Sequence, residues 1–439
     1  MRKYTIEATE ENVLESMEHD VLNRSEDVRD FITMLDMIDY NAFISVDAAW
    51  GEGKTFFVRQ VELTMKYYNK KVFKKGIGEE EKTAFQGNKV LGNLQLEHTY
   101  LPIYFDAWLY DNHVNALMAL LMVAIKQSGK LVDTTQKKDN MASVASILNS
   151  IRFWNSSNWS NLLETTRGED ILKEALLLDE VRQKVKDVFH EILAEEAEKL
   201  VIFIDELDRC KPTFAIEILE SIKHYFDDER ILFVVSVNKS QLIHTISRYY
   251  GEQFDSTRYL NKFFDVNIQL PKANTKAYFD QLGLSTYENY WMKKLTNELQ
   301  TYYSLSLRDT TRYFQKIVSI QEKWGERMGS DSWKVLTIFI PVICVLDIVD
   351  VAKKQRFLSG NGFDILEETI LRSDVTRRFI VRLSGHLEES EENYQSGLKE
   401  LKAIYEFVFR DAGNGGWYSG RIEIYSNLKR ECLRICNNL

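Results

Sequence analysis

The sequence contains few residues that interrupt or crosslink a chain. Only four prolines and four cysteines occur among its 439 residues. So few cysteines do not suggest a disulfide framework, and we expect reduced thiols. Cys432 and Cys436 stand one helical turn apart, but such a pair alone lacks the four ligands of a structural zinc site. The scarcity of proline and the long periodic stretches favour a helix-rich globular fold.

An excess of basic residues and a long apolar run are also missing. The net charge of -10 argues against non-specific nucleic-acid binding, which needs clustered Lys and Arg, but not against a basic partner. The longest apolar run, residues 335–346, is shorter than the roughly 20 residues that span a bilayer, and we expect a buried helix. The first twenty residues are charged throughout, so no signal peptide is expected. We therefore expect a cytoplasmic protein without a transmembrane span.

Short apolar runs alternate with helical patterns in the first part of the chain. They lie at residues 42–46, 100–105, 200–204, 231–237 and 264–270. Residues 1–40 have the pattern of an amphipathic helical lead-in, with Val28, Phe31, Ile32 and Leu35 on one face. The alternation predicts an α/β fold: a parallel sheet of about five strands, covered by helices on both faces.

The strand–helix alternation stops near residue 272. We predict an α/β core over residues 1–272 with an insertion near residues 112–195, and a helical lid and C-terminal helical domain over residues 273–439. Residues 69–98 carry lysines followed by glutamates, and we interpret them as a solvated excursion.

The stretch at residues 127–168 is polar but contains Trp154 and Trp159. Its part at residues 145–163 could form an interfacial amphipathic helix touching lipid or a partner. Docking on its own domain is favoured, because a lipid-binding face would carry more Lys and Arg.

A phosphate-binding loop follows the first apolar run. Residues 48–55, Ala-Ala-Trp-Gly-Glu-Gly-Lys-Thr, fit the P-loop pattern with Ala48 in place of its first glycine, between a strand and a helix. Gly51 and Gly53 allow the backbone to pass close to a polyphosphate and to aim N–H groups at it. Lys54 supplies charge to the terminal phosphates, and Thr55 offers a hydroxyl to Mg²⁺. The predicted nucleotide-binding residues are Ala49, Trp50, Gly51, Glu52, Gly53, Lys54, Thr55 and Phe56.

Carboxylates end the third apolar run. Asp205 and Glu206 follow residues 200–204 directly, and ligands of parallel α/β sheets bind at this edge. We predict that Asp205 and Thr55 hold Mg²⁺ and that Glu206 orients or deprotonates the attacking water. A solvated strand end is the alternative, less favoured beside a P-loop.

Polar residues further along complete the predicted catalytic set of Glu206, Lys54, Asn238 and Arg308. Asn238 follows the fourth run, where P-loop proteins with an additional strand sense the γ-phosphate, although a turn-forming Asn fits equally well. Arg308 lies on a helix beyond the core and is predicted to reach the γ-phosphate from the lid, the alternative being a surface salt bridge. Arg258 or Lys262 acting across a subunit interface like an arginine finger is less favoured.

Together, these motifs resemble the KAP family of P-loop NTPases over roughly residues 20–320. The matching stretches are Leu-Asn-Arg at 22–24, the tryptophan-containing P-loop at 49–55, Phe-Asp-Ala-Trp at 105–108, Ile-Asp-Glu-Leu-Asp-Arg-Cys at 204–210, Tyr-Leu-Asn-Lys at 259–262 and Leu-Pro at 270–271. The resemblance implies an α/β NTPase core, a helical C-terminal part and a role in assembling protein complexes, often at membranes. It also implies a link to phage exclusion, in which some bacterial relatives act. Many members carry transmembrane helices where this chain has only the polar residues 127–168, and Glu206 stands where Asp is frequent, which favours hydrolysis.

From these features we expect an ATP-hydrolysing enzyme whose cycle drives assembly or switching of a protein complex, in bacterial anti-phage defence. Its expected partners are other protein subunits in a homo- or hetero-oligomer, with peripheral membrane contact left open. ATP is favoured over GTP because residues 238–241 match a guanine-specific block only in part. A nucleotide-gated scaffold with little turnover and a phosphotransferase are the alternatives, and a nucleic-acid motor ranks lower.

Overall fold

A computed structural model gives the architecture, which divides into two compact units. One unit spans Glu7–Asn274, and the other includes Thr275–Leu439. The insertion at residues 129–182, and with it the predicted helix at 145–163, lies outside the described residues, as do Cys432 and Cys436. The structure describes residues 7–20, 22–69, 78–112, 115–128, 183, 185–190, 192–193, 197–273, 290–324, 330–370, 374–383, 385–410, 417–418, 423–424 and 430.

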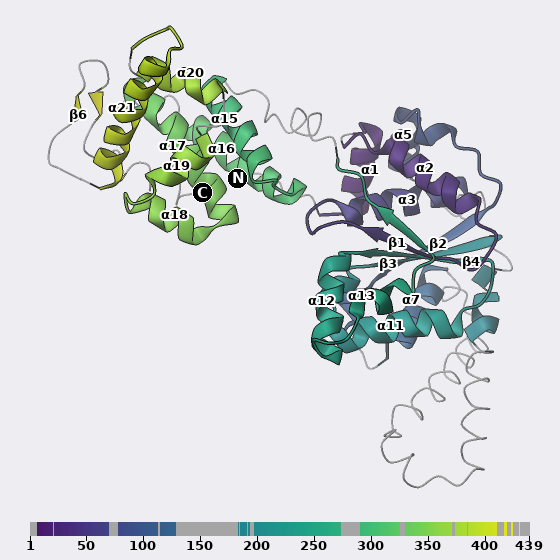
Figure 1. Ribbon diagram of the computed structural model, residues 1–439. Coiled ribbons are helices and arrows are strands. Elements are labelled where there is room, and N and C mark those ends of the chain that lie inside the picture. Colours follow the sequence, from purple (N-terminus) through teal and green to yellow (C-terminus); the bar gives the residue numbers. More distant parts are fainter. Residues whose placement is uncertain are drawn as a thin grey trace. The chain divides into compact units, whose positions relative to one another are not determined.

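A five-stranded parallel sheet forms the centre of the first unit (Figure 1). Its strands are β1 (Phe43–Asp47), β2 (Tyr100–Asp106), β3 (Lys199–Asp205), β4 (Ile231–Val237) and β5 (Val266–Gln269). They lie in the order β2-β3-β4-β1-β5, and every neighbouring pair is parallel. The predicted sheet is confirmed, with β4 as the additional strand between β1 and β3.

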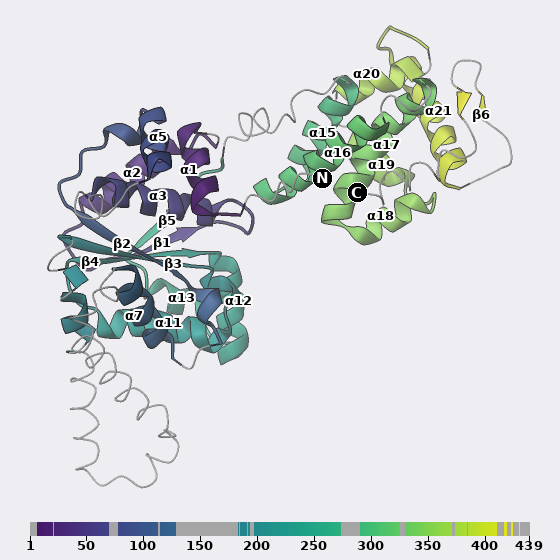
Figure 2. The same cartoon turned by 180° about the vertical axis from the view of Figure 1, so that it is seen from behind.

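Helices cover both faces of this sheet, as Figures 1 and 2 show from opposite sides. One layer contains α1 (Glu10–Glu18), α2 (Ser25–Asp36), α3 (Lys54–Tyr68) and α5 (Glu79–Gly87), and the other contains α7 (Ala116–Gln127), α11 (Pro212–Tyr225), α12 (Lys239–Tyr250) and α13 (Ser256–Asn261). Shorter helices follow two strands and α5: α6 (Ala107–Tyr110), η2 (Leu207–Arg209) and η1 (Leu91–Asn93). Alternate residues of β3 pack on opposite layers, with Val201 and Phe203 on the α2–α3 side and Ile202 and Ile204 on the other. Two buried faces explain why the strands are continuously apolar.

The lead-in helix prediction is confirmed, because Val28, Phe31, Ile32 and Leu35 are all buried in α2. The interpretation of residues 69–98 as a solvated excursion is wrong for its described part. Phe85 of α5 is buried and stacks on Tyr67 with ring centroids 4.0 Å apart. A few apolar side chains within a charged segment are therefore enough to dock it on the core.

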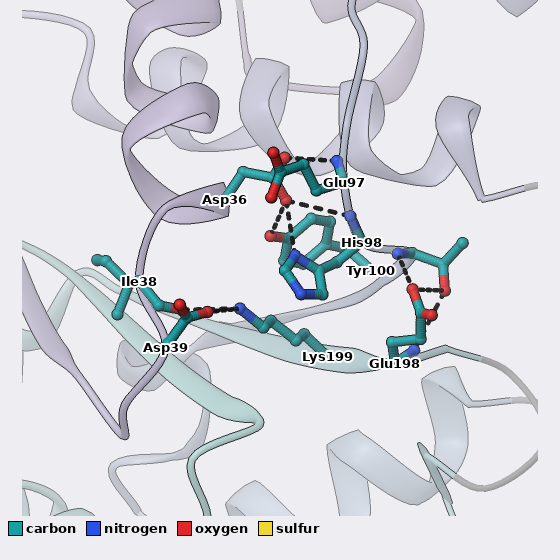
Figure 3. A network of polar contacts seen from close by, with 9 residues as sticks. Asp36, Ile38, Asp39, Glu97, His98, Tyr100, Glu198 and Lys199 are labelled. Carbon is teal, nitrogen blue, oxygen red and sulfur yellow. Dashed lines mark hydrogen bonds and ion pairs between the residues drawn. The ribbon is translucent and has the colours of Figure 1, made fainter.

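A network of polar contacts fixes α2 to the amino ends of β2 and β3 (Figure 3). The buried Asp36 accepts hydrogen bonds from the Tyr100 hydroxyl at 2.5 Å and from the backbone N–H groups of Glu97 at 2.6 Å and His98 at 3.3 Å. Burial raises the pKa of Asp36, but these hydrogen bonds outweigh it, so the net pKa is lowered. Lys199 adds a bond to the Ile38 carbonyl at 2.8 Å. The network lies at the end of the sheet opposite to the P-loop.

The second unit is helical. It contains α15 (Tyr290–Tyr302), α16 (Leu307–Trp324), α17 (Ser330–Val349), α18 (Val351–Leu358), α19 (Phe363–Ile370), α20 (Asp374–Leu383) and α21 (Glu391–Phe409), with a two-stranded antiparallel pair, β6 (Trp417–Tyr418) and β7 (Glu423–Ile424). The predicted buried helix is confirmed in α17, where residues 336–346 are all buried. Among the described residues, no helix is both long and apolar enough to cross a membrane.

Candidate functional site

The P-loop connects β1 to α3 through a backbone that only glycine adopts without strain. Gly51 and Gly53 have φ values of 84° and 83°. Gly53 is the N-cap of α3 and provides no side-chain cap. In the part of the chain that the structure describes, the backbone N–H groups of Gly53, Lys54, Thr55 and Phe56 make no hydrogen bond. Such free donors at a helix N-terminus form an anion-binding site.

Lys54 folds back onto its own loop. Its Nζ donates to the Ala48 carbonyl at 2.7 Å and to the Ala49 carbonyl at 3.3 Å. Burial lowers the pKa of Lys54, and nearby carboxylates, Asp208 first, oppose that effect. Among the described residues Lys54 forms no ion pair, and an anion bound at the helix N-terminus would add a direct counter-charge to the more distant carboxylates.

The P-loop and the carboxyl end of β3 meet at one edge of the sheet. Only β4 separates β1 from β3, so these strands lie about 10 Å apart. Side chains bridge this gap between the strands, because the Thr55 hydroxyl donates to Glu206 Oε1 at 3.5 Å. Asp205 is almost fully buried, and its carboxylate accepts from the Tyr104 hydroxyl and the Glu206 N–H, each at 2.9 Å.

Glu206 lies in a strained and electrostatically crowded position. Its φ of 58° is in the left-handed region, which is uncommon for a residue other than glycine. Burial, followed by the charge of Asp205, raises its pKa to about 7. The Arg209 guanidinium, 2.5 Å from Glu206 Oε2, acts in the opposite direction. A carboxylate with a pKa near neutrality matches a general base.

Trp50 joins the P-loop to the segment after β3. Its indole N–H donates to Asp208 Oδ2, while the ring remains about half exposed. Asp208 is buried, and its Oδ1 has no hydrogen-bond partner among the described residues. Two further side chains were predicted to bind nucleotide. Phe56 packs against the core, and Glu52 is half-buried.

The structure gives Asn238 a clear local role. Its Oδ1 accepts from the Gln241 N–H at 3.3 Å as the N-cap of α12, which leaves the amide nitrogen as its remaining donor. Arg258 and Lys262 are exposed, on and just after α13. Arg308 lies in α16 of the second unit, and its assignment as a γ-phosphate sensor stays a prediction.

Sequence reasoning assigned no role to three residues of this site, although Arg24 and Arg209 lie in stretches that resemble the family. Tyr104 holds Asp205, and its own ring lies 4.6 Å from the Arg59 guanidinium carbon. Arg209 holds Glu206, which the three-residue spacing could have suggested. Arg24 is 1% exposed and donates to the carbonyls of Glu52 and Gly53 in the P-loop. Its place in the Leu-Asn-Arg stretch at 22–24, which resembles the family's lead-in, is the signal that could have found it.

The residues present fit a triphosphate with Mg²⁺. Free N–H groups and Lys54 suit phosphate oxygens, and Thr55 and Asp205 are the hard oxygen donors that Mg²⁺ prefers.

Comparison with protein families supports this assignment. The model of the KAP family P-loop domain matches residues 25–389. A search of curated proteins finds no significant match. The match covers most of the chain, including the P-loop and the acidic end of β3, so the chain belongs to the KAP family of P-loop NTPases.

Proposed function

We propose that this chain binds MgATP in the pocket between the P-loop and β3 and hydrolyses it. One observation carries the proposal: the Thr55 hydroxyl lies 3.5 Å from the Glu206 carboxylate, although 151 positions separate them in sequence. The hydroxyl expected to reach the metal and the carboxylate expected to activate water thus face the same space. The free N–H groups at the start of α3 face the anion that such a site requires.

The chain's own groups account for the reaction. The N–H groups of Gly53, Lys54 and Thr55 bind phosphate oxygens, and Lys54 exchanges the Ala48 carbonyl for the terminal phosphates. Thr55 and Asp205 would hold Mg²⁺, and the hydrogen bond from Tyr104 fixes the orientation of the Asp205 carboxylate. Bound Mg²⁺ neutralises charge on the phosphate oxygens. Glu206 accepts a proton from the water that attacks the terminal phosphorus, the bond from that phosphorus to the β-phosphate oxygen breaks and ADP leaves, and Asn238 assists at the γ-phosphate.

The proposed use of this cycle rests on the resemblance to the KAP family. We propose that it drives assembly or switching of a protein complex, in the cytoplasm and in anti-phage defence, with the second unit as lid and C-terminal domain. Retention of partners by Glu206→Gln in the presence of ATP, and their loss with Lys54→Ala, would support this role. Equal recovery of partners by both variants, with and without ATP, would count against it.

A second candidate is a nucleotide-gated scaffold with little turnover. The ion pair between Arg209 and Glu206 favours it, because the carboxylate must leave this cation to face a water molecule. Single-turnover measurements discriminate between the two: a hydrolytic enzyme converts bound ATP and then releases ADP repeatedly, whereas a scaffold retains intact ATP.

Phosphate release by the purified chain tests the proposal. Wild-type protein should turn over ATP, and Lys54→Ala should lose ATP binding. Glu206→Gln should bind ATP but hydrolyse it about 10² to 10⁴ times more slowly, which is the usual contribution of a general base. Arg29→Met, in α2 with a side chain that is 39% exposed, serves as the control. Turnover that survives in both site variants would reject this pocket as the active site.

A further inference from the structure

We propose that Arg24 is a positioning residue that sets the direction of the phosphate-binding N–H groups. Its guanidinium donates to the carbonyls of Gly53 at 3.2 Å, Glu52 at 2.9 Å and Pro271 at 3.0 Å. The first two belong to the P-loop, and the third follows β5. The inference rests on the proposed nucleotide site and adds a residue that does not itself contact the nucleotide.

Peptide geometry connects these contacts to ligand binding. In a trans peptide the C=O and N–H groups point in opposite directions. The described chain contains no cis peptide bond. When Arg24 holds the carbonyls of Glu52 and Gly53, it therefore directs the N–H groups of Gly53 and Lys54 to the other side of the loop. These are two of the donors that make no hydrogen bond within the described residues.

The burial and charge of Arg24 fit this role. The side chain is 1% exposed, and among the described residues it forms no ion pair and its Nε has no hydrogen-bond partner. Burial lowers its pKa, and Asp27 and Glu52 oppose that only through longer-range charge. A buried cation without a carboxylate partner is costly. An anion bound on the far side of the loop would offset part of that cost. Arg24 therefore favours phosphate binding through its charge, in addition to fixing the loop geometry through its hydrogen bonds.

The preceding loop is shaped to deliver this side chain. Asp20 and Asn23 have φ values of 45° and 52°, in the left-handed region. The Asp20 carboxylate accepts from the backbone N–H groups of Arg24 at 2.9 Å and Ser25 at 3.0 Å. Asp and Asn are the residues other than glycine that adopt this conformation most readily, so the sequence of this loop suits its path.

Three full-length variants test the proposal: Arg24→Met, the charge-preserving Arg24→Lys, and the control Arg29→Met in the helix that Arg24 precedes. Hydrogen exchange is measured without nucleotide at two reporters, the Phe57 N–H, which donates to the Gly53 carbonyl, and the Leu270 N–H, which donates to the Asp47 carbonyl. Steady-state ATP hydrolysis then gives KM and kcat separately.

We expect Arg24→Met to exchange faster at both reporters and to raise KM for ATP by about tenfold or more, with kcat within about twofold. Arg24→Lys should fall between Arg24→Met and the wild type, and Arg29→Met should match the wild type. A merely structural role would lower thermal stability and leave KM unchanged in the folded protein. Wild-type exchange together with wild-type KM in folded Arg24→Met or Arg24→Lys would overturn the proposal. If the wild type turns over no ATP, the proposed function fails, and exchange at Phe57 and Leu270 still decides the role of Arg24.

Discussion

Replacing Arg209 with alanine should shift the acidic limb of the pH–rate profile to higher pH by about one pH unit. The pKa of Glu206 is about 7, because burial and the charge of Asp205 raise it and Arg209, 2.5 Å away, lowers it. Two unit charges about 4 Å apart interact by about 4 kcal/mol at an effective dielectric constant of about 20. The side chains of Arg209 and Glu206 are 29% and 20% exposed. Solvent screening therefore reduces the interaction to roughly 1.4 kcal/mol, equivalent to about one pH unit.

This change has a defined kinetic consequence. At pH 7 the ionised fraction of Glu206 should fall from about one half to about one tenth, and kcat/KM should fall about fivefold with it. At about pH 9 Glu206 is ionised in both enzymes, and the rates should agree within about twofold.

Phosphate release at subsaturating ATP, from about pH 5.5 to about pH 9.5, measures the limb directly. Arg209→Lys keeps the charge and should retain the position found in the wild type. A limb that stays in place in Arg209→Ala, or that moves to lower pH, would disprove the electrostatic coupling between Arg209 and Glu206.

Three further sets of variants probe the network at Asp36, the contact of Trp50 and the titration of Glu206. Tyr100→Phe removes a hydrogen bond to ionised Asp36 and should lower the free energy of unfolding by about 1.5 kcal/mol in urea titrations. Because the pKa of Asp36 is lowered, that carboxylate stabilises the fold above about pH 4, and the difference between Asp36→Asn and the wild type should shrink as pH falls below this value. An unchanged difference at low pH would show that Asp36 acts by packing alone. Trp50→Phe removes the indole donor to Asp208, so it should lower the melting temperature and reduce an ATP-dependent change in tryptophan fluorescence. An identical fluorescence change in the variant would contradict this. Because the pKa of Glu206 is raised to about 7, its contribution to stability is complete below about pH 4.5 and is lost as pH rises through 7. Thermal melts at about pH 5 and about pH 8 should therefore show Glu206→Gln becoming more stable relative to the wild type at the higher pH. Parallel pH dependence in the two proteins would argue against the raised pKa.

The sheet and the P-loop could be predicted because their signals are local. Each buried parallel strand is a continuous apolar run, and the glycines at 51 and 53 stand where the backbone turns to positive φ. The docking of α5 could not be predicted, because its burial rests on single residues such as Phe85 within a charged segment. Asn238 satisfied two patterns at once, and only the structure shows its oxygen capping α12.

The contacts that shape the site are not local. Arg24 reaches carbonyls that are 28, 29 and 247 positions away in sequence, and Tyr104 and Asp205 are 101 positions apart. A single sequence records no such pairing, since an arginine that binds buried carbonyls and one that faces water have the same local pattern. The chemistry of the motifs was therefore predictable, whereas the residues that orient them required the fold.

A crystal structure of Glu206→Gln with ATP and Mg²⁺ would decide whether the pocket between the P-loop and β3 is the nucleotide site. We expect terminal phosphate oxygens about 3 Å from Lys54 Nζ and from the N–H groups of Gly53 and Lys54, and a metal about 2.1 Å from Thr55 Oγ1. A triphosphate bound elsewhere, with Lys54 still hydrogen-bonded to the Ala48 carbonyl and no metal beside Thr55, would contradict the assignment.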